Sequence, residues 1–287
     1  MAAAAAAGAT KITVRKSAER GVGDHGWLNS KFTFSFADYS DRRFDSFGLL
    51  RVLNDDTVKS GGGFPTHSHA NFEIWSYILS GRLAHKDSMG NSEVLSRGDV
   101  QFTSAGKGIS HSEFNGDTTA GGRGEDVRFL QIWAPPSTKN LQPSYQTGRF
   151  PDALKRDAFC PILVPAASRS ADAQQHRNSE GAPLFINNSL HMHASIISPG
   201  KSLTLAVQGD KAYIHLPIMP GSAGVAVTAT NGASVTLAPG DGAFVENARE
   251  LAFVGLGEAG VAAGGGGPTP ATGATPTGTE LVVMHGL

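Results

Sequence analysis

Short runs of alternating or β-branched and aromatic residues, each ending at a glycine or proline turn, recur through most of the sequence. Alternation places apolar side chains on one face of an extended strand, whereas a helix needs them three and four positions apart. In the first half, such runs occupy residues 11–15, 32–36, 74–79, 100–103 and 129–133. Because turn signals recur about every 8–12 residues, the pattern predicts an all-β sandwich or barrel.

The second half of the chain repeats this β character, with runs at residues 195–197, 203–207, 212–216 and 243–245. A Gly-Asp turn leads into a strand-like run once in each half, at residues 98–99 and 240–241. We therefore expect two barrels in tandem, joined by the weakly patterned segment 137–159. The predicted division is a disordered tail at 1–10, domains at 11–138 and 139–287, and disordered insertions near 166–181 and 255–278.

Charge balance and cysteine content exclude several classes of protein. The 287 residues include 24 basic and 25 acidic side chains, and no basic run indicates direct nucleic-acid binding. No apolar run approaches the roughly 18 residues of a membrane span. Cys160 is the single cysteine and cannot form an intrachain disulfide, which fits a reducing compartment. The alanine-rich start indicates a tail, with an organellar targeting peptide as the alternative.

Two histidines one residue apart, His67 and His69, follow a proline in the segment Phe-Pro-Thr-His-Ser-His. In a strand, residues two apart share one face and lie about 6–7 Å from each other, so both imidazoles can reach one ion. His111 and Glu113 have the same spacing and follow a glycine-rich turn. Together, the two pairs offer three nitrogens and one oxygen to a metal. The alternative is that all four are ordinary polar residues of the surface or core.

The ligand types favour a particular metal chemistry. Three imidazoles and a carboxylate suit a divalent iron-type ion, whose six-coordination would leave two positions for water, dioxygen or substrate. A closed structural zinc site would more often use thiolates, which the single cysteine cannot supply. The residues therefore predict an Fe²⁺ site, with other divalent metals as alternatives.

The spacing around the two pairs matches the cupin pattern, and longer blocks resemble the pirin family, in particular its branch of quercetin 2,3-dioxygenases. These blocks run in order from about residue 15 to residue 136. They are residues 26–30, 33–39, 50–56, 64–69, 85–91, 98–101, 105–115 and 130–133. Resemblance beyond residue 145 is looser.

The resemblance implies a bicupin, two tandem jelly-roll β-barrels, with iron only in the first barrel and a degenerate second barrel. It implies His67, His69, His111 and Glu113 as the metal ligands. Glu113 is also a candidate catalytic base. Glu73 occupies the position at which many other cupins place a carboxylate ligand, and we keep it as a residue that supports the ligands or takes part in catalysis.

Other histidines allow more than one interpretation. His85 and Asp87 either hold a ligand imidazole in place or form a salt bridge or turn cap in a hairpin. His191 and His193 repeat the His-x-His spacing in the second half, but no His-x-Glu pair follows them. We expect these two to be ordinary strand residues.

Together with the candidate metal site, the resemblance implies an iron-dependent dioxygenase, of the quercetin 2,3-dioxygenase type, that opens a ring of a flavonol-like substrate. Its partners would be a small aromatic molecule and dioxygen, and we expect a cytoplasmic monomer. The alternative is a regulator that senses iron oxidation state and binds a transcription-related or enzyme partner, with the nucleus as a second compartment. A third reading is a metal that only stabilises the barrel.

Overall fold

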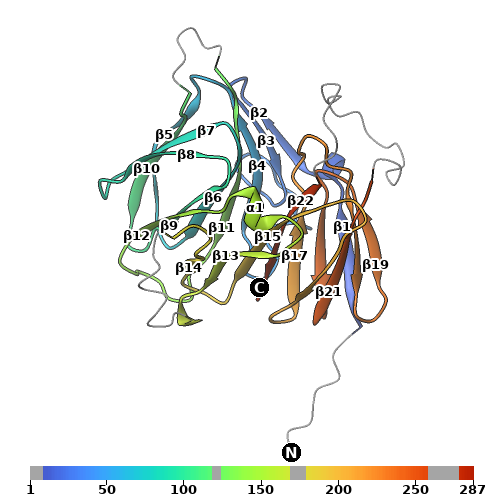
Figure 1. Cartoon of the computed structure of the whole chain (residues 1–287). Coiled ribbons are helices and arrows are strands. Elements are labelled where there is room, and N and C mark those ends of the chain that lie inside the picture. The colour runs from blue at the N-terminus through green and yellow to red at the C-terminus, as the bar shows by residue number, and fades with distance from the viewer. Residues whose placement is uncertain (1–8, 118–123, 169–178, 258–277) are drawn as a thin grey trace, which may run out of the picture. The chain divides into compact units, whose positions relative to one another are not determined.

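The structure is a computed structural model that describes residues 9–117, 124–168, 179–257 and 278–287. It divides into two compact units. The N-terminal unit comprises Arg20–Leu154 and Cys160–Leu190, and the C-terminal unit comprises Met1–Glu19, Lys155–Phe159 and His191–Leu287. Each unit contains two antiparallel sheets (Figure 1), which confirms the predicted all-β fold with two barrels.

The N-terminal unit is built from a seven-stranded and a four-stranded sheet. The larger sheet has the order β12-β9-β6-β11-β4-β3-β2. Its strands are β2 (Gly21–Asp24), β3 (Leu28–Phe32), β4 (Val52–Val58), β6 (Glu73–Ser80), β9 (Asp99–Ser104), β11 (Val127–Ala134) and β12 (Ser144–Arg149). The smaller sheet has the order β5-β10-β7-β8, with β5 (Gly63–His69), β7 (Arg82–Asp87), β8 (Ser92–Ser96) and β10 (Ile109–Asn115). A parallel pair, β13 (Cys160–Pro165) and β14 (Leu184–Ile186), belongs to the same unit.

The C-terminal unit has the same two-sheet plan. One sheet contains the neighbouring strands β1-β20-β17-β22-β15, and the other has the order β16-β21-β18-β19. These strands are β1 (Lys11–Arg15), β15 (His191–Ile197), β16 (Ser202–Ala206), β17 (Lys211–His215), β18 (Val225–Ala229), β19 (Ser234–Leu237), β20 (Gly242–Glu246), β21 (Glu250–Gly255) and β22 (Thr279–His285).

Helical structure is confined to short segments in the described residues. They are the single-turn helix α1 (Asp152–Lys155) and the 3-10 turns η1 (Ser17–Glu19) and η2 (Ala166–Ser168). None of the described helices has the length and apolar character needed to cross a bilayer.

The units divide the chain differently from the predicted cut after residue 138. Strand β1 pairs along its whole length with β20, from Lys11 opposite Glu246 to Arg15 opposite Gly242, so the chain starts in the C-terminal unit. The segment Cys160–Leu190, with β13 and β14, lies in the N-terminal unit, so that unit reaches residue 190 instead of ending at residue 138. Most of the predicted tail and of the two predicted insertions lies outside the described residues.

The interiors of the two units differ in polarity. The C-terminal barrel is filled by an apolar cluster that includes Ile197, Ile214, Val227, Phe253 and Val283. The N-terminal unit has a smaller apolar cluster around Phe129 and Ile78. Above it, a row of paired polar residues crosses three strands: Asn54 of β4 lies opposite Gln131 of β11, which lies opposite Ser76 of β6. This polar interior marks the N-terminal barrel as the place for a functional site.

Candidate metal centre

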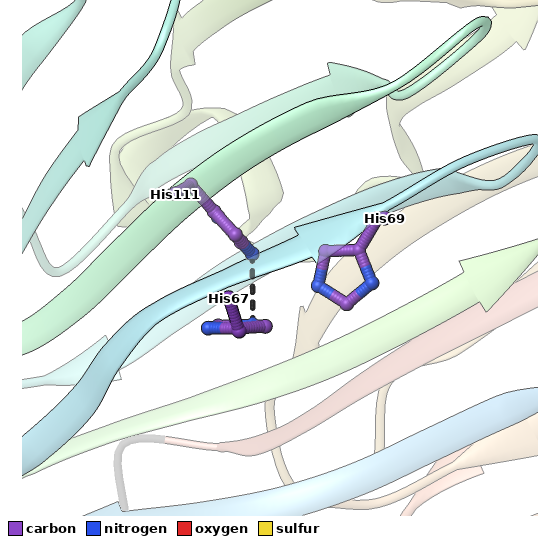
Figure 2. Close-up of side chains that lie close together, drawn as sticks. All are labelled: His67, His69 and His111. Carbon is purple, nitrogen blue, oxygen red and sulfur yellow. Dashed lines mark hydrogen bonds between the residues drawn. The ribbon is translucent and has the colours of Figure 1, made fainter.

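Strands β5 and β10 bring the three predicted ligand histidines together. The strands pair antiparallel, with His111 directly opposite His67 and Ile109 opposite His69. The three ring centroids lie 4.5 to 4.9 Å apart. One nitrogen from each ring lies within 4.8 Å of the others, a separation that allows one ion to bind all three. Figure 2 shows the rings of His67, His69 and His111 converging, with a dashed hydrogen bond between His67 and His111.

Local sequence explains why these two strands can present their histidines in this way. β5 is an edge strand, and an edge strand can accommodate Pro65, which has no backbone N–H to donate to a neighbouring strand. The pairing with β10 shifts register between His111 and Glu113, where Glu113 lies opposite Phe64. Before β10, Gly106 has φ +45°, and a Cβ there would lie 2.0 Å from the carbonyl oxygen of Leu141. Gly106 therefore allows the chain to turn sharply just before β10, as the glycine-rich sequence predicts.

The histidines have the protonation state that metal binding requires. Burial, and then the neighbouring histidines, lowers the pKa of His69 to about 4. Burial followed by His67 lowers the pKa of His111 to about 4, against an opposing effect of Asp87. Both rings are therefore neutral at pH 7 and keep a lone pair for a metal. His67 donates its Nδ1 proton to the carbonyl oxygen of Pro65 at 2.8 Å, which leaves Nε2 as the free acceptor.

A buried ring nitrogen of His69 that lacks a hydrogen-bond partner within the described part of the chain indicates that a metal fits this cluster. Nε2 of His69 is buried and has no hydrogen-bond partner among the described residues. Nε2 of His67 faces Nε2 of His111 at 3.1 Å. A buried ring nitrogen without a partner is costly in a protein interior, and a shared cation satisfies all three nitrogens at once. The residues present therefore fit a divalent transition metal.

His85 supports His111, whereas Asp87 does not. Nε2 of His85 lies 3.2 Å from Nδ1 of His111, and its ring stacks on Tyr145 with centroids 5.2 Å apart. With a metal on Nε2 of His111, Nδ1–H of His111 can donate to His85. Asp87 instead accepts hydrogen bonds from the backbone N–H groups of Met89 and Asn91 and caps the β7–β8 turn. Of the two interpretations offered by the sequence, support of a ligand imidazole thus applies to His85, and the turn cap applies to Asp87.

Glu113 lies beside the histidines but outside their three-residue cluster. Its Oε1 accepts a hydrogen bond from Ser76 at 3.1 Å, and its Oε2 accepts one from Nε2 of Gln131 at 2.9 Å. The carboxylate is buried and belongs to the lining of the same cavity as His67 and His69. The sequence alone does not indicate Ser76 and Gln131, because their contact with Glu113 depends on how the two sheets face each other.

The structure does not bring Glu73 to the histidines. Glu73 and Ser76 are three residues apart on β6, so their side chains point to opposite faces of the sheet, and Ser76 points to the cavity. The carboxylate of Glu73 accepts hydrogen bonds from Ser104 at 2.6 Å and from the side chain of Asn187 at 3.0 Å. Burial raises its pKa, against the opposing effect of these bonds. Its contacts are those of a residue that ties β6 to the segment after β14.

A cavity of about 500 Å³ opens beside the cluster. Aromatic and aliphatic side chains form much of its wall, including Trp27, Phe32, Phe36, Phe64 and Trp133. Trp133 contacts His69 edge to face at 4.8 Å, and Trp27 contacts Phe64 in the same manner at 5.2 Å. The polar residues of the lining include Ser30, Asn54, Asp56 and Gln131. The cavity therefore suits an aromatic molecule that reaches the histidines at one end.

The second His-x-His pair lies in the C-terminal unit. His191 and His193 are half-buried on β15, and each ring stacks on His285 of β22. Nε2 of His285 lies 3.2 Å from Nδ1 of His193, and Nδ1 of His285 accepts the backbone N–H of Gln208. The parallel planes of these rings do not direct their nitrogens to one point, unlike the rings of the first cluster.

The chain is similar to proteins of one family. The model of the Pirin family matches residues 13–134. A quercetin 2,3-dioxygenase of Escherichia coli (strain K12) is 43% identical over 169 residues, which cover 59% of this chain and 69% of that protein. A pirin-like protein of Caulobacter vibrioides is 34% identical over 239 residues, which cover 83% and 92% of the two chains.

Solved structures show the same relationship. The bacterial pirin YhhW from Escherichia coli in complex with nickel(II) superposes with a TM-score of 0.73 at 28% identity. The match covers 96% of this chain and 98% of that one, so it includes both units. A quercetin 2,3-dioxygenase from Acinetobacter baumannii shares the fold with a TM-score of 0.62 at 19% identity. With relatives of this identity and coverage, and with the predicted histidines brought together in the N-terminal barrel, the chain belongs to the pirin family.

Proposed function

We propose that this chain is an iron-dependent dioxygenase that opens a ring of a flavonol-like substrate. The observation that carries the proposal is the cluster of His67, His69 and His111 next to a largely aromatic cavity of about 500 Å³. Curated relatives named quercetin 2,3-dioxygenase, one of them 43% identical, support the reaction class. Fe²⁺ is favoured because nitrogen and carboxylate donors suit it and because the reaction uses dioxygen.

The side chains of the site have separate roles in this proposal. His67, His69 and His111 would hold the metal, with Glu113 as the fourth ligand. When bound, the metal would supply Lewis-acid stabilisation of a substrate oxygen that loses its proton. Trp27, Phe64 and Trp133 would enclose the aromatic rings and exclude water.

The carboxylate of Glu113 is the proposed acceptor of the substrate proton. Its two oxygens each accept one hydrogen bond, from Ser76 and Gln131, so the group is held in one orientation. Each carboxylate oxygen has lone pairs beyond the one that these bonds use. One of those remaining lone pairs can take a proton from a hydroxyl in the cavity.

Oxygen consumption with quercetin on iron-loaded protein tests the function. We expect uptake that the His111→Ala variant abolishes, because one of three metal-holding nitrogens is lost. His191→Ala, a histidine of the C-terminal unit, is the matched control and should retain uptake. Absence of uptake in the iron-loaded wild-type chain, with iron shown to be bound, would contradict the proposed reaction.

A further inference from the structure

The cavity has a polar floor that lies far from the histidines. Trp133 of β11, which contacts His69, lies opposite Val52 of β4, and Phe129 lies opposite Asp56. These two positions are four residues apart on β11, so Asp56 lies about 13 Å along the strand from the level of Trp133. Glu113 lies between these levels, because it contacts Gln131. The separation of about 13 Å between the level of Asp56 and that of Trp133, which contacts His69, is comparable to the length of two or three fused or linked rings.

The floor is built from one buried carboxyl group and one hydroxyl. Asp56 is 2% exposed and lines the cavity, and Ser30 Oγ donates to its Oδ1 at 2.5 Å. Ser30 lies directly opposite Asp56 in the β3–β4 pairing, so the two side chains share the inner face. The adjacent Asp55 points to the other face of β4, where Arg128 binds both of its oxygens at 2.8 Å. This salt bridge therefore lies on the opposite face of β4 from Asp56.

The surroundings of Asp56 favour its uncharged form. Burial raises the pKa of Asp56 to about 7, and the negative charges of Asp55 and Glu113 act in the same direction. The hydrogen bond from Ser30 and the charge of Arg20 oppose this rise. A carboxyl group in this position can accept a hydrogen bond in either state and can donate one when it is protonated. A buried polar group of this kind discriminates strongly between ligands that do and do not complete its hydrogen bonds.

From this placement we infer that Asp56 is a specificity residue that binds a hydroxyl group at the end of the substrate remote from the histidines. The inference rests on the proposed function and deepens it. The substrate class is an uncharged, elongated aromatic with metal-binding oxygens at one end and at least one phenolic hydroxyl at the other. A carboxylate or sulfate at the floor end would lose its hydration in a buried site and would face the ionised fraction of Asp56, and both effects oppose its binding.

Two flavonols separate recognition at the floor from recognition at the histidines. Quercetin and 3-hydroxyflavone share the 3-hydroxyl and 4-keto oxygens, but only quercetin carries hydroxyls on its outer rings. Binding to the nickel-loaded full chain is measured without oxygen by quenching of tryptophan fluorescence, since Trp27 and Trp133 line the cavity. We expect the wild-type chain to bind quercetin about 10- to 100-fold more tightly than 3-hydroxyflavone. Equal affinity of the wild-type chain for the two flavonols would overturn the inference without any variant.

Variants assign the preference to Asp56. Asp56→Val should bring the ratio of the two affinities close to one while 3-hydroxyflavone still binds, and Asp56→Asn, which keeps a donor and an acceptor, should retain most of the preference. Asp55→Asn, on the opposite face of the strand, is the matched control and should leave the ratio unchanged. A ratio that survives in Asp56→Val would overturn the inference and leave the proposed function standing. A nickel-loaded wild-type chain that binds neither flavonol would overturn both.

Discussion

At the scale of single residues, the site depends on side chains that act through His111 and Glu113. His85 contacts Nδ1 of His111, and Gln131 and Ser76 hold the two oxygens of Glu113. All three supporting residues are buried. Substitution of any of them by an apolar residue would leave a buried polar atom of His111 or Glu113 without that hydrogen bond. The hydrogen bonds form two groups inside the N-terminal barrel: one joins His85, His111 and His67, and the other joins Ser76 and Gln131 to Glu113.

His85 should control metal affinity without contacting the metal. We expect His85→Phe to weaken metal binding by about 10- to 100-fold, because Nδ1–H of His111 loses its acceptor. His85→Gln keeps a side-chain acceptor and should recover part of the affinity. Competition against a chelator of known affinity measures both variants. Tyr145→Phe, which keeps the ring stacked on His85, is the control, and an unchanged affinity in His85→Phe would refute the role.

Gln131 should affect stability through Glu113. In Gln131→Leu, Oε2 of Glu113 loses a hydrogen bond in a buried position, which costs about 1–3 kcal/mol. Urea denaturation of metal-free protein should show this loss as a lower midpoint with an unchanged slope. A Gln131→Leu chain that is as stable as the wild type would show that water or another group replaces the amide.

The residue pattern predicted that three histidines lie together and offered His85 as a possible support, but it did not indicate Ser76 or Gln131. His67, His69 and His111 could be predicted because alternation along one strand, read twice, places them on one face. Ser76, Gln131 and His85 lie on other strands, and only the register between strands brings them to their partners. No local pattern in the sequence encodes that register, so the partner of each of these residues emerges only from the fold.

At the scale of elements, the turn before β10 sets the direction in which His111 enters the site. Gly106 combines a positive φ with a close approach to the carbonyl oxygen of Leu141, and Lys107 N–H donates to that same oxygen at 2.9 Å. The turn is thus packed against the segment before β12. The glycine-rich stretch in the sequence was sufficient to predict a sharp turn, although not the segment that contacts it.

Gly106→Ala should lower the free energy of unfolding by more than the cost of placing alanine at a positive φ. A Cβ at Gly106 meets a backbone oxygen that cannot move aside, whereas a Cβ at Gly90, with φ +94°, meets nothing within 4 Å. Both substitutions carry the conformational cost of a positive φ, about 1 kcal/mol or more. We expect a clearly larger fall in the free energy of unfolding for Gly106→Ala, measured by urea denaturation. Equal losses in the two variants would mean that the turn can shift.

At the scale of the whole molecule, buried histidines in both units couple stability to pH. Burial is the largest cause that lowers the pKa of His69 and of His111 to about 4, and it does the same for His193. Burial likewise lowers the pKa of His285, to about 3. In the unfolded chain these rings titrate near 6.5, so between about pH 4 and 6.5 the unfolded state binds more protons. Stability from these groups rises with pH in that window.

The carboxyl group of Asp56 acts in the opposite direction. Its pKa of about 7 lies above the unfolded value of 3.8, so between these values the folded state binds the extra proton and stability from this group falls as pH rises. Burial raises the pKa of Glu73 as well, which acts with Asp56, and lowers the pKa of His85, which acts with the other histidines. Five histidines outweigh two carboxyl groups. We therefore expect the urea midpoint of the metal-free chain to fall as pH is lowered from 7 to 5. A midpoint that rises on acidification would contradict the assignment of these histidines as neutral.

The division of the chain shows what local sequence cannot predict. The β character of both halves and the repeated Gly-Asp turn predicted two barrels in tandem, and the resemblance to pirins implied the same bicupin fold. The pairing of β1 with β20 joins residues more than 200 positions apart, and the return of residues 160–190 to the N-terminal unit depends on contacts with distant strands. Both features are long-range, so a cut at the least patterned segment does not coincide with the division into compact units.

Metal stoichiometry tests the central claim most directly. Anaerobic titration of the full chain with Fe²⁺, followed by elemental analysis after gel filtration, should find one tightly bound ion per chain. The account predicts that this ion is lost in His111→Ala and retained in His191→Ala. A wild-type chain that binds no ion, or an ion that persists in His111→Ala and disappears in His191→Ala, would contradict the claim that β5 and β10 build the metal centre.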